Sequence, residues 1–385
     1  MKRLLLGLWD KLRFASGHGV PPSGGETGLM SQSRDSSAAR PSCVTPAEAG
    51  TPCQNARAVG CQALLWSLTI AGGLGLSQTQ AAAPLRFVGI CDASAVVALN
   101  DDLVAVGDDE DNAIRIYSSR RGGNPLFAAD ISSFLKIKPK KAEVDIEAAA
   151  RLGDRIYWIS SHGCNAAGKP QRSRRQFFAT TGLAMNGAIE LKPLGKPYHN
   201  LLEDLCREPR LARFNLRRAA GLAPKSPGAL NIEGLAATPE GYLLIGFRNP
   251  IPDGKALLVP LLNPGDLLAG KAAQFGEPLL LDLHGLGIRS ITDREGGYLI
   301  VAGRPDEGGQ SRLYEWRGGL DQPRLLAVTA FFGLNPEAIS FPPAGGGPAS
   351  LFVTSDDGTA MVGGKPCKSL KDPRQKSFRA LRVPW

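Results

Sequence analysis

The sequence predicts an all-β fold built from repeated strand hairpins, and three observations support this. A pattern of a short strand, a tight turn and a more apolar second strand recurs along the chain. Four of its five copies share one register without a gap. The 46 glycines and 29 prolines among 385 residues suit a chain rich in turns.

The clearest copy of the repeat reads NIEGLAATPEGYLLIGFRN, with Glu233 as position zero, Asn231 at minus two and Arg248 at plus fifteen. Side chains alternate along a strand, and a hairpin returns its second strand beside its first. We therefore expect these three positions to meet at one end of each hairpin. The zero positions are Ser94, Glu147, Glu233, Arg289 and Glu337. The plus-fifteen positions are Asp109, His162, Arg248, Arg304 and Asp357, the last after a turn five residues longer.

Hairpins of this kind bury their apolar faces when they stack radially as a β-propeller, whose first strands line a central channel. At about 40–50 residues per blade, residues 84–385 predict about six blades, with five to seven possible. Residues 199–220 have the apolar spacing of two short helices broken at Pro209 and predict a helical insertion.

The N-terminal part differs in composition. Residues 1–56 are rich in Ser, Pro, Gly and Ala, which predicts a disordered extension or a start site assigned too far upstream. The apolar run at residues 63–76 predicts that 57–83 form a signal peptide or an anchor. Because a spanning helix needs about 20 apolar residues, we expect export to the periplasm or medium, with membrane anchoring as the alternative. The propeller domain, 84–385, is expected to be a monomer.

Four cysteines lie in the propeller domain, and no Cys-x-x-Cys pair argues for zinc. A ring that closes on itself brings its two ends together. We therefore expect the disulfides Cys91–Cys367 and Cys164–Cys206, with four free thiols as the alternative.

The chain is basic, with 45 Lys and Arg against 36 Asp and Glu, a formal charge of +9. The excess is concentrated in residues 136–141, 169–175 and 207–218. These runs suit solvated loops, or contact with a polyanion or an anionic membrane. Since no aromatic residues are regularly interleaved with them, we expect no nucleic-acid surface.

Acids outnumber arginines in the predicted ring of repeat positions. Two carboxylates about 5 Å apart repel by about 3 kcal/mol at an effective dielectric of about 20, so the ring must take up protons, form ion pairs or bind a cation. Calcium prefers such oxygen ligands. Its expected ligands are Glu147, Glu233, Glu337, Asp92 and Asp145.

Three functions remain open on these residues. The first is binding of a small anionic ligand, at a cluster formed by Arg248, Arg304, Arg289, Asp109 and Asp357. The second is metal-dependent hydrolysis of an ester, lactone or phosphoester, with His162 as general base. The third is a non-enzymatic interaction scaffold, in which the ring residues only hold blades together. The sequence contains no Gly-x-Ser-x-Gly, phosphate-binding loop or His-Glu-x-x-His motif, and leaves open whether the protein is an enzyme.

The motifs GICDASAVVAL, DIEAAARLGDRIYWISSHG, NIEGLAATPEGYLLIGFRNP, LLDLHGLGIRSI and SDDGT occur in one order and resemble a bacterial family catalogued as domain of unknown function 3616. The resemblance spans Phe87 to Arg382 and implies a propeller-like fold. A looser similarity links the Asn/Asp-x-Glu-Gly/Ala motif to esterase-like phytase and calcium-dependent lactonase propellers. Glu147, Glu233 and Glu337 match this motif, whereas Ser94 and Arg289 depart from it.

Overall fold

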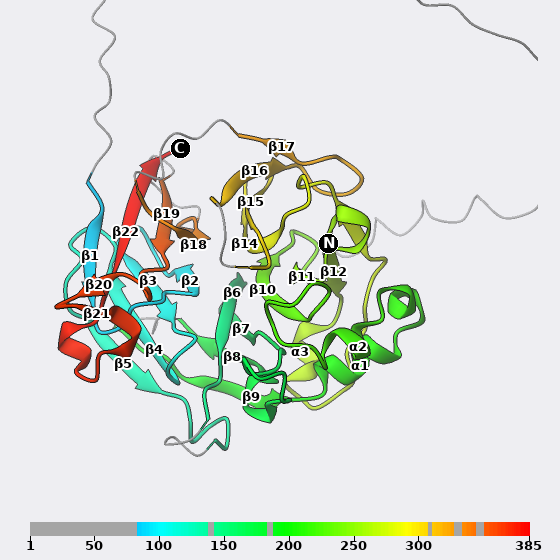
Figure 1. Cartoon of the computed structure of the whole chain (residues 1–385), viewed down its shortest axis with the longest axis horizontal. Coiled ribbons are helices and arrows are strands. Elements are labelled where there is room, and N and C mark those ends of the chain that lie inside the picture. Colours follow the sequence, from blue (N-terminus) through cyan, green and yellow to red (C-terminus); the bar gives the residue numbers. More distant parts are fainter. Residues whose placement is uncertain (1–82, 138–141, 183–187, 307–309, 327–332, 344–349) are drawn as a thin grey trace, which may run out of the picture. The chain divides into compact units, whose positions relative to one another are not determined.

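Five four-stranded antiparallel sheets surround a central channel in the computed structural model, which describes residues 83–137, 142–182, 188–306, 310–326, 333–343 and 350–385 (Figure 1). The innermost strands contact one another in chain order, and the last contacts the first, so the ring closes. These strands are β2 (Ala95–Ala98), β6 (Ile146–Leu152), β10 (Asn231–Ala237), β14 (Gly287–Arg294) and β18 (Pro336–Ser340). The fold is a five-bladed β-propeller, which confirms the predicted class.

Each blade adds three strands outside its innermost one. The second strands are β3 (Leu103–Gly107), β7 (Arg155–Ser160), β11 (Leu243–Asn249), β15 (Gly297–Gly303) and β19 (Ser350–Ser355). The third strands are β4 (Ala113–Ser118), β8 (Phe177–Thr181), β12 (Ala256–Leu261), β16 (Arg312–Trp316) and β22 (Ser377–Pro384). The outermost strands are β5 (Phe127–Asp130), β9 (Pro193–Tyr198), β13 (Leu279–Leu281), β17 (Arg324–Leu325) and β1 (Leu85–Val88).

The predicted helical insertion accounts for the long interval between Glu147 and Glu233, whose described residues form no additional blade. Its elements are α1 (Leu201–Arg207), the 3₁₀ helix η2 (Pro209–Phe214) and α2 (Leu216–Ala219). Pro209 starts η2, because proline lacks the N–H needed inside a helix but fits its first turn. The remaining short elements are η1 (Arg172–Arg174), η3 (Pro252–Gly254), α3 (Pro264–Leu267), β20 (Met361–Val362), β21 (Lys365–Pro366), η4 (Cys367–Ser369) and η5 (Pro373–Gln375).

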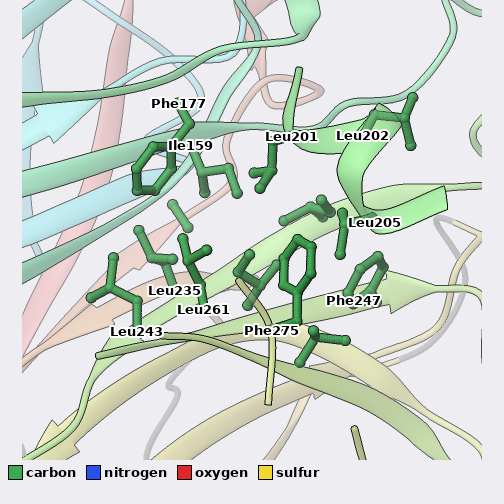
Figure 2. Close-up of a cluster of buried hydrophobic side chains, with 14 of the residues drawn as sticks. Ile159, Phe177, Leu201, Leu202, Leu205, Leu235, Leu243, Phe247, Leu261 and Phe275 are labelled. Carbon is green, nitrogen blue, oxygen red and sulfur yellow. The ribbon is translucent and has the colours of Figure 1, made fainter. Parts of the chain in front are cut away.

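The insertion covers the largest buried cluster, which fills the space between the second and third blades. Leu201, Leu202 and Leu205 of α1 belong to this cluster together with side chains of those blades, among them Phe177 and Phe247 (Figure 2). All five side chains are buried. A helix this short is marginal on its own, so we infer that packing of its leucines holds it in place.

The ring is closed by both ends of the described chain. β1 pairs with β22 in the last blade, and Phe87 of β1 stacks on Phe378 of β22 with ring centroids 4.9 Å apart. The predicted Cys91–Cys367 disulfide is formed nearby. The other predicted pair is wrong: Cys164 and Cys206 are free, and the Cys164 thiol contacts the carbonyl of Ala220 at 3.0 Å.

The predicted N-terminal extension and the apolar run at 63–76 lie outside the described residues. Within the part of the chain that is described, no helix is long and apolar enough to cross a membrane.

Candidate functional site

A β-bulge marks the zero position of the repeat in the second, third and fourth blades. Glu147, Glu233 and Arg289 are each an extra residue without a partner on the neighbouring strand. The fifth blade has a similar irregularity between Pro336 and Ile339. A bulge bends its strand and re-aims a side chain, which here turns the zero positions towards one end of the channel.

A cavity of about 680 Å³ opens at that end. Its lining unites eight of the residues predicted from the repeat, which are Asp92, Asp109, Asp145, Glu147, Glu233, Arg248, Arg289 and Glu337. We call this cavity the channel mouth. The channel mouth therefore brings together acids of the first, second, third and fifth blades with Arg248 and Arg289, as the repeat register predicted.

In the third blade, the minus-two, zero and plus-fifteen residues meet as expected. Arg248 Nη1 donates to Glu233 Oε1 at 2.7 Å, and Asn231 Nδ2 donates to the same oxygen at 2.6 Å. Burial alone would lower the pKa of Arg248, but the Glu233 carboxylate raises it above its ordinary value. Arg248 Nε also donates to the carbonyl of Arg304 at 2.8 Å and so joins the third blade to the fourth.

Arg289 of the fourth blade forms ion pairs with two acids of the fifth blade, Glu337 and Asp356. Its Nη1 also donates to Asn335 Oδ1 at 3.2 Å. Burial raises the pKa of Glu337 to about 7, while Arg289 acts in the opposite direction. The minus-two residue of this blade is Gly287, because a Cβ there would lie 1.9 Å from the Arg248 carbonyl oxygen.

Asp92 of the first blade hydrogen-bonds to Asp356 where the ring closes. Burial, this hydrogen bond and the charge of Asp109 raise the pKa of Asp92 to about 10. Burial and the neighbouring Asp108 also raise the pKa of Asp109 well above its ordinary value. One oxygen of each residue, Asp92 Oδ1 and Asp109 Oδ1, is buried without a hydrogen-bond partner among the described residues.

In the second blade, Asp145 accepts hydrogen bonds from Ser161 and from Arg174 Nη1, the latter at 3.1 Å. Burial raises the pKa of Asp145 to about 6, with Arg174 opposing it. Glu147 makes no hydrogen bond or ion pair within the described ranges. Burial raises its pKa well above the ordinary value, and the nearby carboxylates, Glu233 first, add to this effect.

The two sides of the channel mouth therefore differ in how their acids are paired. Arginines balance the acids of the third, fourth and fifth blades. On the side of the first two blades, Asp92, Asp109 and Glu147 have no paired arginine or lysine among the described residues. Uncharged carboxyl groups are favoured there, because a buried carboxylate without a countercharge is costly.

Three predicted site residues do not line the channel mouth. His162 is buried behind it, with Nδ1 2.8 Å from the carbonyl oxygen of Ser160, and burial lowers its pKa to about 4. Arg304 forms an ion pair with Asp306 at 2.7 Å, and Asp357 forms one with Arg379 at 2.7 Å. His162 is therefore not placed to act as a general base in the channel mouth, and Arg304 is not placed to bind an anion there.

The cavity includes functional candidates that the repeat did not predict, Asp356 and Arg174. The longer turn of the fifth copy shifts the register by one residue, so Asp356 takes the place expected for Asp357. Arg174 belongs to η1, which lies between strands and outside the repeat. Within the described residues, no group of three or more His, Cys, Asp or Glu side chains is arranged to hold a metal ion.

The family described as "Protein of unknown function (DUF3616)" matches residues 185–331, a shorter stretch than the predicted resemblance, which it confirms. Among solved structures, a glutaminyl cyclase of Myxococcus xanthus is 11% identical over 79% of this chain and 96% of its own, with a TM-score of 0.44. An aldose sugar dehydrogenase of Streptomyces coelicolor is 10% identical over 79% and 97%, with a TM-score of 0.38. No curated protein matches by sequence.

Proposed function

We propose that the channel mouth binds a small organic cation, such as an amine, beside the acids of the first two blades. The observation that supports this most directly is the charge imbalance. Asp92, Asp109 and Glu147 lack a paired basic side chain among the described residues, and the charge of Asp109 acts on both of the others. A cation that entered between them would supply the missing countercharge and displace their protons.

The contacts of the arginines favour a cation over the anion that the sequence suggested. Arg248 and Arg289 are held by Glu233, Glu337 and Asp356. A bound anion would have to compete with these carboxylates for the two guanidinium groups. Coulomb attraction in such a buried ion pair is much stronger than in water, so displacing either carboxylate would be costly.

The size of the channel mouth favours an organic ligand over a lone metal ion. Its volume of about 680 Å³ lies within the range of about 300–1,000 Å³ that is typical of small-molecule pockets. A divalent ion would need several oxygens converging at about 2.0–2.6 Å. Among the described residues, no three acids are grouped in this way.

The experiment is isothermal titration calorimetry of the full chain with 1,3-diaminopropane, 1,3-propanediol and succinate, which differ in charge at a similar size. We expect the diamine to bind best and its affinity to fall at least about tenfold in Glu147→Gln, because one charge-assisted contact is lost. Glu190→Gln, which changes a partly exposed acid paired with Lys192 outside the channel mouth, is the matched control. Binding of the uncharged diol as tight as that of the diamine, or equal effects of the two variants on diamine affinity, would refute the proposal.

We propose further that the domain functions outside the cytosol. The Cys91–Cys367 disulfide supports this, since such bonds persist mainly in oxidising compartments. Cell fractionation combined with thiol labelling tests it. Recovery of the protein in the cytosol with Cys91 and Cys367 reduced would contradict it.

A further inference from the structure

We infer that a second ligand site lies in a basic cleft beside the channel mouth, and that it takes a small oxyanion carrying a hydroxyl group. This site uses none of the residues of the proposed cation site. The two proposals can therefore fail independently.

The cleft joins three segments that are distant in the sequence. It has a volume of about 630 Å³ and is lined by the segment after β5, by η1 with the residues that follow it, and by the start of α1. Two of the basic runs noted in the sequence contribute to it, through Lys136 and through Arg172 and Arg175. Of the first run, residues 138–141 lie outside the described chain.

The cleft carries an excess of positive charge. Arg175 Nη1 pairs with Glu203 Oε1 at 2.8 Å, so these two charges cancel. Lys136 and Arg172 are exposed and form no ion pair within the described residues. With His199 neutral, the lining carries a formal charge of +2. Lys136 has a φ of 57°, an unusual left-handed conformation for lysine, and such residues are enriched at functional sites.

Gln176 provides the second, independent observation. Its side chain is 2% exposed and lines the cleft, yet Oε1 has no hydrogen-bond partner in the described part of the chain. Buried amides are nearly always hydrogen-bonded, because an unpaired one destabilises the fold. An amide that is buried, unpaired and at the wall of a cavity is suited to a ligand.

These groups define the chemistry of the ligand. Arginine and lysine side chains bind carboxylate or phosphate oxygens. Gln176 Oε1 accepts a hydrogen bond, so the ligand must also offer a donor, which a hydroxyl group supplies. A hydroxycarboxylate and a phosphorylated polyol share this chemistry.

The test is calorimetric titration of the full chain with glycerol 3-phosphate and tartrate, and with methyl phosphate and succinate as counterparts without the hydroxyl. We expect the hydroxylated anions to bind more tightly. A preference between glycerol 3-phosphate and tartrate would support the site and identify the oxyanion. Arg172→Gln should weaken all four by at least about tenfold, because a charge-assisted contact is lost. Lys196→Gln, which removes an exposed lysine of β9 outside the cleft, is the matched control.

Gln176→Leu separates a ligand-binding role from a structural one. If the amide serves a ligand, this variant should remove the preference for hydroxylated anions while the melting temperature stays unchanged or rises. The inference is overturned if no anion binds at millimolar concentration, or if Arg172→Gln behaves like Lys196→Gln. It is also overturned if Gln176→Leu keeps the preference.

Discussion

Arg289 and Glu337 occupy the same repeat position in adjacent blades, and their side chains form a buried ion pair. The fourth blade thus supplies a cation at the position where three of the other four blades supply a glutamate. The pair also holds Asp356 and Asn335 of the fifth blade through Arg289. It therefore connects two blades, and Arg289 provides the countercharge for the acids of the fifth blade.

Removing this arginine should be costly. Arg289→Met leaves Glu337 and Asp356 buried without their countercharge, and we expect it to lower the free energy of unfolding by about 3–5 kcal/mol. Urea denaturation at pH 7 measures the change. The double variant Arg289→Met/Glu337→Gln should recover part of the loss, because it removes one unpaired charge. A double variant less stable than the single one would contradict this account.

The stability of the ligand-free protein should fall as pH rises. Burial raises the pKa of Asp145 to about 6, of Glu337 to about 7 and of Asp92 to about 10. Between about pH 4 and pH 10 the folded chain therefore holds protons that the unfolded chain has released. Each such group lowers the free energy of unfolding by up to about 1.4 kcal/mol per pH unit within its own part of that range.

Urea denaturation at pH 6.5 and pH 8.5 checks this dependence, because the lowered pKa of His162 gives a slope of opposite sign only below about pH 6.5. We expect lower stability at pH 8.5, and a smaller difference in Glu147→Gln, whose side chain cannot ionise. Higher stability at pH 8.5 would mean that the acids are ionised and balanced in the empty channel mouth.

Gly287 should tolerate no side chain. A Cβ there would lie 1.9 Å from the carbonyl oxygen and 2.5 Å from the carbonyl carbon of Arg248, which are backbone atoms and cannot turn away. We expect Gly287→Ala to lower the free energy of unfolding by about 1–3 kcal/mol, as overpacking does. Gly221→Ala is the matched control, because Gly221 also lacks a positive φ and its Cβ would meet the Arg218 carbonyl oxygen at an ordinary 3.4 Å. Equal melting temperatures of the two variants would disprove the close approach.

The two sets of cysteines should behave differently. Loss of the Cys91–Cys367 bond, in the variant with both cysteines changed to serine, should cost about 2–5 kcal/mol of stability. Changing Cys206 to serine should cost little, since it is a free and only half-buried thiol. Peptide mass mapping without reduction gives the pairing directly. Detection of a Cys164–Cys206 linkage would contradict the structure.

Strand geometry explains why part of the site was predictable from the sequence. Alternation along strands and the return of each hairpin bring Asn231, Glu233 and Arg248 together whatever the rest of the chain does. The same rule fails where the backbone leaves the strand. His162 follows the end of β7 with a φ of 58°, so Ser161 reaches the cavity in its place.

Other features depend on contacts that no local pattern records. Arg174 and Gln176 lie in the connection before β8, whose path is set by packing against other segments. The blade number could only be bounded, because helices α1 and α2 occupy a length of chain similar to part of a blade. The pairing of Arg289 with Glu337 arises between blades and follows from ring closure.

The most direct test of the central claim is the proton balance of cation binding. Titration of the full chain with 1,3-diaminopropane at pH 7, in two buffers that differ in ionisation enthalpy, measures the protons exchanged. The diamine is fully protonated at this pH, so we predict a net release of protons from the acids of the first two blades. Binding without proton release would contradict the claim that these acids hold protons while the channel mouth is empty.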